Sequence, residues 1–543
     1  MRRMNHRGTE TQRTRGKGRA AFSSSRFHIL LLPLCLCASV VNLSCSSKPT
    51  DLRTLAPAET LVYLETNDLA AALQPIVDSK PFSEVAKTKP DFSALKGVQL
   101  AVAVTGFETS EEKLTDEHSV GKIQPHFIAI ADTHAWHFQA VGFAEKKIGS
   151  FVANIYDSEP QLEQSDKNGG KYFTWTAADG RKAYALVIDS LIYFTNVETA
   201  IDKCLAVRRG EADGIAKNGK VRPTDPATLA SGYISPDGVA QIANIAALKF
   251  ASDASDESEI QSAIAGIIPQ LIRGVVTDVT WVQTKTDSGL QDSWQINMPS
   301  DVANVFKETL ASSGNFQPSV FSGLPPNIPV ATSYNFKSGQ VAWRSVLLVA
   351  QQKTDAIAGR MLAEFGKLMF EPYGIKDPEL FFAAGNSGPL TMNFSPDGDK
   401  PVLRTSYIDE RKMNGSVDQD LRRQQPDGEW RTSDGEIVAR QIDVTWISGD
   451  AESVRKLDLS SDKPSLADTL KTDFDKDSVV VTVGKDSQLT EKLVGFLAME
   501  GHGDMASVAN YSVQTKFKNS GMERKTTSDF GFIGWIIAKL NDD

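Results

Sequence analysis

The sequence predicts an α+β protein of two duplicated lobes, each a mainly antiparallel sheet with flanking helices. Hairpin patterns without regular βαβ alternation favour antiparallel sheets, and a hairpin-strand-helix pattern recurs about 255 residues along the chain. Hydrophobic residues make up 41% of the 543 residues, which is enough for a packed core and for two or three domains. The predicted organisation is a signal peptide at 1–44, a lipid tether at 45–54, a first lobe at 55–250, a connecting helix and hairpin at 251–320, and a second lobe with a C-terminal tail at 321–543.

The first 44 residues have the pattern of a secretory signal. Basic residues come first, an apolar run follows from Ile29 to Leu43, and the small residue Ser44 ends the segment. The run is shorter than the roughly 18–20 residues that span a bilayer, and Pro33 interrupts it. We therefore expect export from the cytosol, with an uncleaved membrane anchor as the alternative.

The end of this signal resembles that of a bacterial lipoprotein, in which a small residue precedes a cysteine that becomes lipidated. Ser44 precedes Cys45 in this way, although the two residues before Ser44 depart from the usual pattern. Two of the four cysteines lie inside the signal, so the mature chain keeps only Cys45 and Cys204. We predict that Cys45 is lipidated and that Cys204 is a small buried hydrophobe. A disulfide between the two is the alternative.

The charge distribution argues against nucleic acid as a partner. The chain has a net charge of -10, and its first 44 residues hold eight basic side chains and one acidic one. The mature chain is therefore strongly acidic and would repel phosphate backbones.

In the first lobe, buried strands are expected at Val98–Val104 and Phe127–Ala131. A helix over Leu69–Val77 follows the capping residues Asn67-Asp68, and another begins at Ser235-Pro236. Asp179-Gly180 predicts a hairpin, because this dipeptide suits turns that need positive φ.

The second lobe is expected to repeat this plan. Asp434-Gly435 predicts a second hairpin 255 positions after the first. A strand then leads into a capped helix in both places, at Leu191–Leu205 and at Val444–Leu457. A further helix with one apolar face is expected after Thr354.

Between the lobes, the hairpin Val276–Met298 either completes the first sheet or bridges the two. The acidic stretch Ser252–Glu259 is most simply a solvated linker. The apolar tail Phe530–Ala538 is too short to span a membrane, and we expect it to dock on the core as a strand or helix. Contact with a membrane surface is the alternative.

The phrase Pro57-Ala-Glu-Thr-Leu-Val-Tyr63, with Gly232-Tyr233 before a helix, resembles a bacterial family of extracytoplasmic proteins of unknown function. Repeats of that family open with Pro-Ala-Asp-Thr-x-x-Tyr, and here Glu59 replaces the aspartate. The resemblance covers roughly residues 55–500. It implies an extracytoplasmic location and a two-lobed build, and it supplies no catalytic residues.

Asp132, His134 and His137 form a candidate metal half-site. On a helix starting near Thr133 the two imidazoles would share a face, and with a carboxylate they would suit Zn or Fe(II). Surface or packing histidines are the simpler interpretation, since no His-Glu-x-x-His frame is present.

The loop Glu500-Gly-His502-Gly-Asp504 offers a second candidate for acid–base chemistry. A turn between a helix and a strand is the simpler interpretation, and no Gly-x-Ser-x-Gly nucleophile motif occurs in the chain.

The sequence therefore favours a non-catalytic, lipid-anchored protein of the bacterial cell envelope that faces the periplasm or the exterior. We expect no catalytic residues, no cofactor and no nucleic acid; the partners are the membrane, through the anchor, and a protein or envelope component. The alternative is an exported hydrolase or metal-dependent enzyme that uses His134 and His137 or the His502 loop. A structural or folding-assistance role would require an exposed apolar groove.

Overall fold

The computed structural model describes residues 49–113, 119–156, 158–221, 225, 227–254, 258–385, 391–395, 400–457, 464–470, 474–498 and 507–539. The strands are β1 (Val62–Thr66), β2 (Gln99–Lys113), β3 (Ser119–Asp132), β4 (Gln161–Lys167), β5 (Gly170–Thr176), β6 (Lys182–Ile188), β7 (Leu191–Thr195), β8 (Thr228–Ile234), β9 (Asp278–Thr286), β10 (Gly289–Asn297), β11 (Val330–Tyr334), β12 (Thr391–Ser395), β13 (Val402–Ser406), β14 (Trp430–Arg431), β15 (Ile437–Ile442), β16 (Thr445–Asp450), β17 (Val480–Asp486), β18 (Ala509–Lys518) and β19 (Gly521–Ser528).

The helices are α1 (Leu69–Asp78), α2 (Lys80–Val85), α3 (His137–Phe143), α4 (Gly149–Tyr156), α5 (Glu198–Arg208), α6 (Pro236–Ala254), α7 (Ser258–Val275), α8 (Ser300–Thr309), α9 (Gly339–Lys353), α10 (Ala356–Leu368), α11 (Pro378–Ala384), α12 (Glu410–Ser416), α13 (Ala451–Lys456), α14 (Leu466–Thr469), α15 (Leu489–Leu497) and α16 (Gly531–Lys539). Short 3-10 turns are η2 (Leu52–Thr54), η3 (Ser93–Leu95), η5 (Ile215–Asn218), η6 (Pro318–Phe321), η7 (Glu371–Tyr373) and η8 (Asp420–Arg422), and η4 (Ala144–Ile148) is a π turn.

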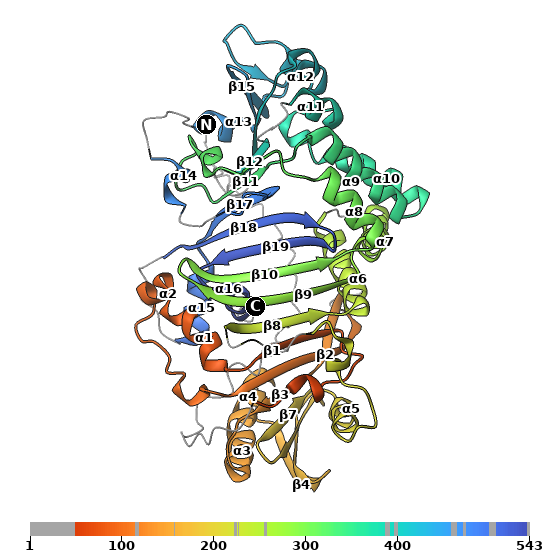
Figure 1. Cartoon of the computed structure of the whole chain (residues 1–543), viewed down its shortest axis with the longest axis vertical. Helices are drawn as coiled ribbons and strands as arrows, with labels where there is room; N and C mark the ends of the chain where they lie inside the picture. The colour runs from red at the N-terminus through yellow and green to blue at the C-terminus, as the bar shows by residue number, and fades with distance from the viewer. Residues whose placement is uncertain are drawn as a thin grey trace, which may run out of the picture.

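The described strands form one continuous antiparallel sheet of 19 strands. Its spatial order is β4-β5-β6-β7-β3-β2-β1-β8-β9-β10-β19-β18-β17-β11-β12-β13-β16-β15-β14. The strands are stacked along the long axis of the molecule (Figure 1). One sheet therefore runs through the whole molecule from one end to the other.

Alternating side chains give this sheet two faces. In β2, Leu100 and Val102 belong to one core, whereas Ala101 and Ala103 belong to another. We call the side of Leu100 and Val102 face A, and the side of Ala101 and Ala103 face B. Since successive residues of a strand point to opposite sides, apolar residues on both sides require cover on both faces.

Helices cover most of the sheet, but different ones at each end. In the N-terminal half, face A packs against α1–α4, α15 and α16, and face B packs against η2, α5 and η5. In the C-terminal half, face A packs against α11 and α12, and face B packs against η6, α13 and α14. Between these covered regions, none of the described helices joins an apolar core on face B of β9, β10 and β19.

The prediction of two duplicated lobes, each with its own sheet, is wrong. β10 pairs with β19 along its length, from Leu290 opposite Ser528 to Asn297 opposite Gly521. Without this pairing each half would expose a long edge strand with unpaired backbone N–H and C=O groups. Joining the two edges satisfies these groups, so the hairpin β9–β10 bridges what we had expected to be separate sheets.

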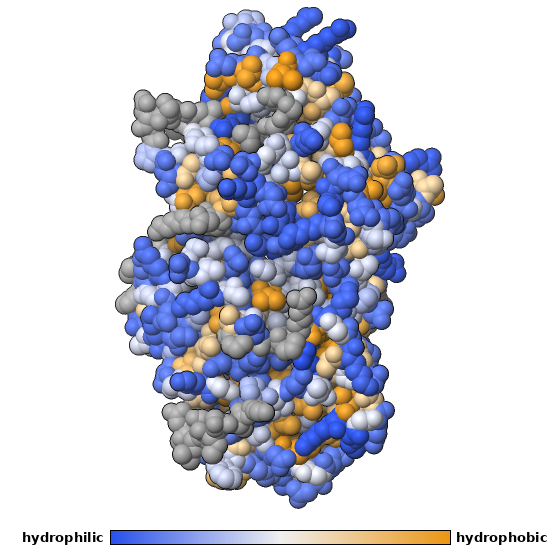
Figure 2. All heavy atoms as spheres, viewed as in Figure 1, coloured by the Kyte–Doolittle hydropathy of each residue, from blue (hydrophilic) through white to orange (hydrophobic). Residues whose placement is uncertain are grey.

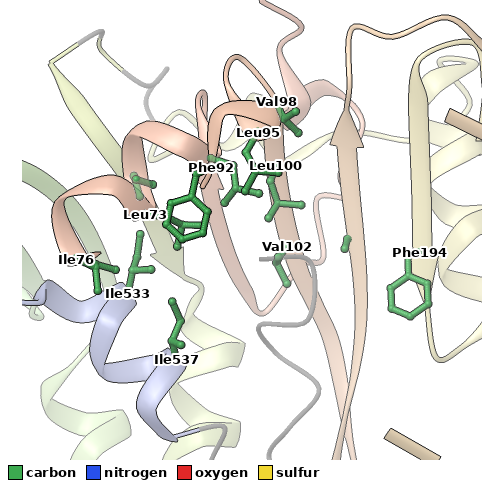
Figure 3. Close-up of a cluster of buried hydrophobic side chains, with 14 of the residues drawn as sticks. Leu73, Ile76, Phe92, Leu95, Val98, Leu100, Val102, Phe194, Ile533 and Ile537 are labelled. Atoms are coloured by element: carbon green, nitrogen blue, oxygen red, sulfur yellow. The ribbon is translucent and has the colours of Figure 1, made fainter. Parts of the chain in front are cut away.

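The C-terminal segments also cross the expected boundary near residue 320. α15 and α16, which we had assigned to the second lobe, pack in the same core as α1. Figure 3 shows Ile533 and Ile537 of α16 beside Leu73 and Ile76 of α1. The tail does dock on the core as a helix, as predicted, but on the core of the N-terminal half.

The local elements follow the predictions more closely. Asp179-Gly180 turns between β5 and β6, and Asp434-Gly435 between β14 and β15, with both glycines at positive φ. Asp68 caps α1 by accepting a hydrogen bond from the Ala71 N–H at 3.0 Å. β7 leads into α5 and β16 into α13, as expected. Asp450 caps α13, whereas Val197, rather than Asn196, is the N-cap residue of α5.

No helix among the described residues is long and apolar enough to cross a membrane.

Candidate functional site

Two sequence predictions fall outside the described residues. Cys45 and the predicted signal at 1–44 precede the first described residue, and His502 is also outside the described ranges. Cys204 is buried on α5, and burial raises the pKa of its thiol. It packs among the apolar side chains of face B, as predicted.

The structure brings Asp132 and His134 together but not on a helix. α3 begins at His137 rather than near Thr133, and His134 has a φ of 51°. The His134 N–H donates to Asp132 Oδ1 at 3.0 Å, and its Nδ1 lies 3.5 Å from the same oxygen. His137 points elsewhere, with Nδ1 3.4 Å from the carbonyl oxygen of Asp189. His134 and His137 therefore do not lie on one face of a helix, as the predicted metal site required.

Asp132 has a structural partner as well. Its Oδ2 accepts a hydrogen bond from Thr50 Oγ1 at 2.5 Å, and the side chain is almost fully buried. Within the ranges that the structure describes, no group of three or more His, Cys, Asp or Glu side chains could hold a metal ion.

The strip of face B formed by β9, β10 and β19 carries mainly polar side chains and has no described helix packed on it. We call it the polar face and define it by the residues of β9, β10 and β19 that point to this side, of which Thr527 is buried and most others are half-buried: Thr280, Val282, Thr284, Gln291, Ser293, Gln295, Glu523, Lys525 and Thr527. No helix crosses in front of these strands in Figure 1, and Figure 2 shows mainly hydrophilic surface over the middle of the molecule from the same side. Hydrogen-bonding side chains at regular strand spacing thus line this strip.

An ion-pair cluster borders the polar face on the side of β18. Asp475 Oδ2 lies 2.9 Å from the ammonium groups of both Lys516 and Lys525. Burial opposes ionisation of Asp475, but these two ammonium groups hold its pKa below the ordinary value. Asp477 lies 3.3 Å from Lys516 as well. The ion pairs hold these side chains in place, and the cluster contains both positive and negative groups.

A buried carboxyl group lies on β1, which β8 separates from the polar face. Glu65 points to face B, and its Oε2 accepts a hydrogen bond from the Tyr63 hydroxyl at 2.9 Å. Burial raises the pKa of Glu65 to about 7, although the Tyr63 hydroxyl and the Arg53 guanidinium favour the charged form. Arg53 is itself paired with Asp51 at 2.7 Å. Glu65 is therefore a group that changes charge near neutral pH.

Two hollows lie at opposite ends of the sheet, away from the polar face. One, of about 600 Å³, is formed by His137, Phe138 and Val141 of α3 with the β4–β5 turn at 166–171. The other, of about 400 Å³, lies beside Tyr407 and the β15–β16 turn at 441–444. Each is an open surface depression formed at a hairpin turn.

Sequence reasoning did not identify the polar face. Its residues come from β9–β10 and from β19, which lie more than 220 residues apart in the chain and meet only through the β10–β19 pairing. The sequence of β10 alone does contain a relevant pattern. Gln291, Ser293 and Gln295 occupy alternate positions, which indicates that one side of this strand is polar. Without knowing the neighbouring strand, this alternation could not be extended to a surface.

Comparisons of the chain with protein-family models, with curated proteins and with solved structures found no match.

Proposed function

We propose that this chain is an exported lipoprotein, anchored through Cys45, that binds a protein or an envelope component on its polar face without catalysing a reaction. The basic and apolar leader ending at Ser44-Cys45 supports export and anchoring. The resemblance of the Pro57–Tyr63 phrase to extracytoplasmic proteins supports the same location.

The polar face, on which no described helix packs, is the observation that carries the binding proposal. Three strands of eight or nine residues cover about 15 by 30 Å at the usual strand spacing and rise. A stable interface buries roughly 800 Å² on each partner, so a partner that covers this strip would also reach the bordering ion pairs of Asp475. The side chains are held by the sheet, which reduces the entropy lost on binding.

The composition of the polar face indicates the chemistry of the partner. Glutamine, serine and threonine side chains offer both donors and acceptors, and Val282 is 37% exposed among them. The charges at its edge are paired, as Lys525 with Asp475 shows. This surface suits a polar macromolecule of mixed charge better than a strongly anionic one.

The anchor is tested by changing Cys45→Ala. The expected result is release of the protein from the membrane fraction, because the lipid chains at one cysteine provide the attachment. Cys204→Ala is the matched control and should leave the protein in the membrane, since Cys204 is buried in the core. Unchanged fractionation of the Cys45 variant would rule out the anchor.

The polar face is tested by placing a photo-crosslinking amino acid at Gln291 or Ser293 in the native envelope. We expect a discrete adduct from both positions, and none from the same amino acid at Arg360, which is exposed on α10. Adducts that form equally at Arg360, or at none of the three positions, would contradict binding at the polar face.

A further inference from the structure

Two large aromatic side chains are exposed where α3 begins. Trp136 is 65% exposed and Phe138 is 71% exposed. Gln139 fixes this turn, because its Oε1 accepts a hydrogen bond from the Trp136 N–H at 3.2 Å. Tryptophan and phenylalanine side chains at this exposure are costly in water, whereas tryptophan is enriched at the boundary between lipid and water.

The N-terminal segment reaches the protein at the same place. Thr50 is bound to the start of β2, where its N–H donates to Gln99 Oε1 at 2.7 Å. It is also bound to the end of β3, where its hydroxyl donates to Asp132 Oδ2. The Gln99 side chain donates back to the Thr50 carbonyl oxygen at 2.9 Å. The chain that follows the predicted lipidation site is therefore fastened a few residues before α3.

Covalent geometry limits how far this place can lie from an anchored Cys45. Cys45 and Thr50 are five positions apart, so they lie at most about 18 Å from each other when the chain is fully extended. Trp136 follows Asp132 by four residues and so lies within about 15 Å of it. An acyl chain on Cys45 would thus hold the exposed aromatic turn near the bilayer surface.

We propose that the turn of Trp136 and Phe138 rests on the phospholipid surface to which Cys45 is anchored, as a second contact of the protein with the membrane. This inference depends on the anchoring in the proposed function. Two lysines of the adjoining β4–β5 hairpin are paired with carboxylates, Lys167 with Glu198 at 2.6 Å and Lys171 with Asp166 at 3.6 Å. Contact is therefore driven by the aromatic side chains and does not require anionic lipids.

This contact would also set the orientation of the molecule. α3 lies at the end of the sheet that carries β4 (Figure 1). With that end on the membrane, the polar face stands away from the bilayer, where it is accessible to a partner.

The test uses the lipidated chain in vesicles of phosphatidylethanolamine and phosphatidylcholine. A thiol placed by His137→Cys, between the two aromatic residues, reports access to a water-soluble maleimide; Cys204 is buried and does not interfere. We expect at least a fivefold slower reaction on vesicles than for the same thiol in the soluble Cys45→Ala chain. A thiol placed by Ile357→Cys on α10, where the native side chain is 66% exposed, should react equally fast in both.

The double change Trp136→Ser and Phe138→Ser should abolish the protection at position 137. Both side chains are exposed, so the fold is retained, and circular dichroism checks this. Equal maleimide rates on and off the vesicle would overturn the second contact but leave the anchor intact. Protection that appears only in native membranes would also overturn it, because a membrane protein rather than lipid would then cover the turn. Failure of the lipidated chain to stay on vesicles would instead count against the proposed anchoring.

Discussion

At the scale of single residues, two buried carboxyl groups have pKa values raised by desolvation. Glu65 points to face B with only Tyr63 as a direct hydrogen-bond donor among the described side chains, and its pKa is about 7. Asp292 lies on face A under α16, and burial raises its pKa to about 6 despite hydrogen bonds from Trp281, Gln283 and the Phe532 N–H. Both groups make the stability of the protein depend on pH.

Glu65→Gln is expected to stabilise the protein at pH 8 and to have little effect at pH 4. The folded pKa of Glu65 lies above its ordinary value of 4.5, so the folded state binds the proton more tightly. The contribution of this group to the free energy of unfolding is therefore present below pH 4.5 and is lost as the pH rises through 7. Two and a half pKa units correspond to at most about 3 kcal/mol.

Urea unfolding of the wild type and the Glu65→Gln variant across this pH range measures the effect. Glu364→Gln is the control, because Glu364 is 69% exposed beside Lys367 and an exposed pair contributes little. A Glu65→Gln variant that is less stable than the wild type at pH 8 would refute the assignment.

Asp292→Ala is expected to destabilise the protein by about 2–4 kcal/mol. Three buried donors would lose their acceptor: Trp281 Nε1 and Gln283 Nε2 at 2.9 Å, and the Phe532 N–H at 2.7 Å. Each unsatisfied buried donor costs roughly 1–3 kcal/mol before relaxation. Chemical denaturation measures the loss, and Asp287→Ala, at the exposed β9–β10 turn, should change stability by less than about 0.5 kcal/mol. Equal effects of the two changes would show that the carboxylate of Asp292 does not hold α16.

At the scale of elements, α16 connects the end of the chain to the N-terminal core. Ile537 is fully buried, Phe530 is 1% exposed, and Phe532 contacts Trp281 and Trp294 with ring centroids 5.2 and 4.8 Å apart. The helix therefore fills a space between α1 and the middle strands on face A (Figure 3). It stabilises the sheet from the side opposite the polar face.

Ile537→Ala is expected to destabilise the whole protein by about 2–5 kcal/mol, the range for a fully buried isoleucine. The matched control is Ile357→Ala on α10, where the same side chain is 66% exposed and the change should cost well under 1 kcal/mol. Thermal unfolding of both variants measures the difference. If the two variants melt at the same temperature, α16 contributes no packing energy to the core.

At the scale of the whole molecule, the continuous sheet couples the two ends. β10 and β19 are neighbours although one belongs to the connecting segment and the other to the C-terminus. Backbone hydrogen bonds between β10 and β19 connect residues before position 320 with residues after it. The packing of α15 and α16 in the N-terminal core connects them as well. Neither half can keep its sheet edge and its core when the other unfolds.

We therefore expect a protease site inserted near Gly314 to leave the cleaved protein associated. The two pieces should co-elute in native size-exclusion chromatography and unfold in a single calorimetric transition. The N-terminal piece alone should not fold, since β10 would become an exposed edge and Trp281 would lose Phe532. Two separate transitions, or a stable isolated piece, would refute the coupling.

The short-range features of this fold could be predicted from the sequence, because local chemistry determines them. Asp179-Gly180 and Asp434-Gly435 form turns where positive φ is needed, and Asp68 and Asp450 cap helices as their side chains predict. The buried strands expected at 98–104 and 127–131 are also present, as parts of β2 and β3. The candidate ligand set failed because it assumed a helix from Thr133, while the left-handed φ of His134 delays the helix to His137.

The sequence by itself determined the leader pattern, the acidic charge of the chain after residue 44, the hairpins at Asp179-Gly180 and Asp434-Gly435 and the caps at Asp68 and Asp450, since each depends on local composition or on residues only a few positions apart. Tertiary structure alone decided that the strands form one sheet, that α16 packs on the distant N-terminal core and that no described helix packs over a polar strip on face B. These features depend on which edges pair and which helices fill which face. The pairing of strand edges and the packing of helices leave few backbone groups unpaired and little apolar surface exposed over the whole chain. A pattern of a few neighbouring residues does not specify them.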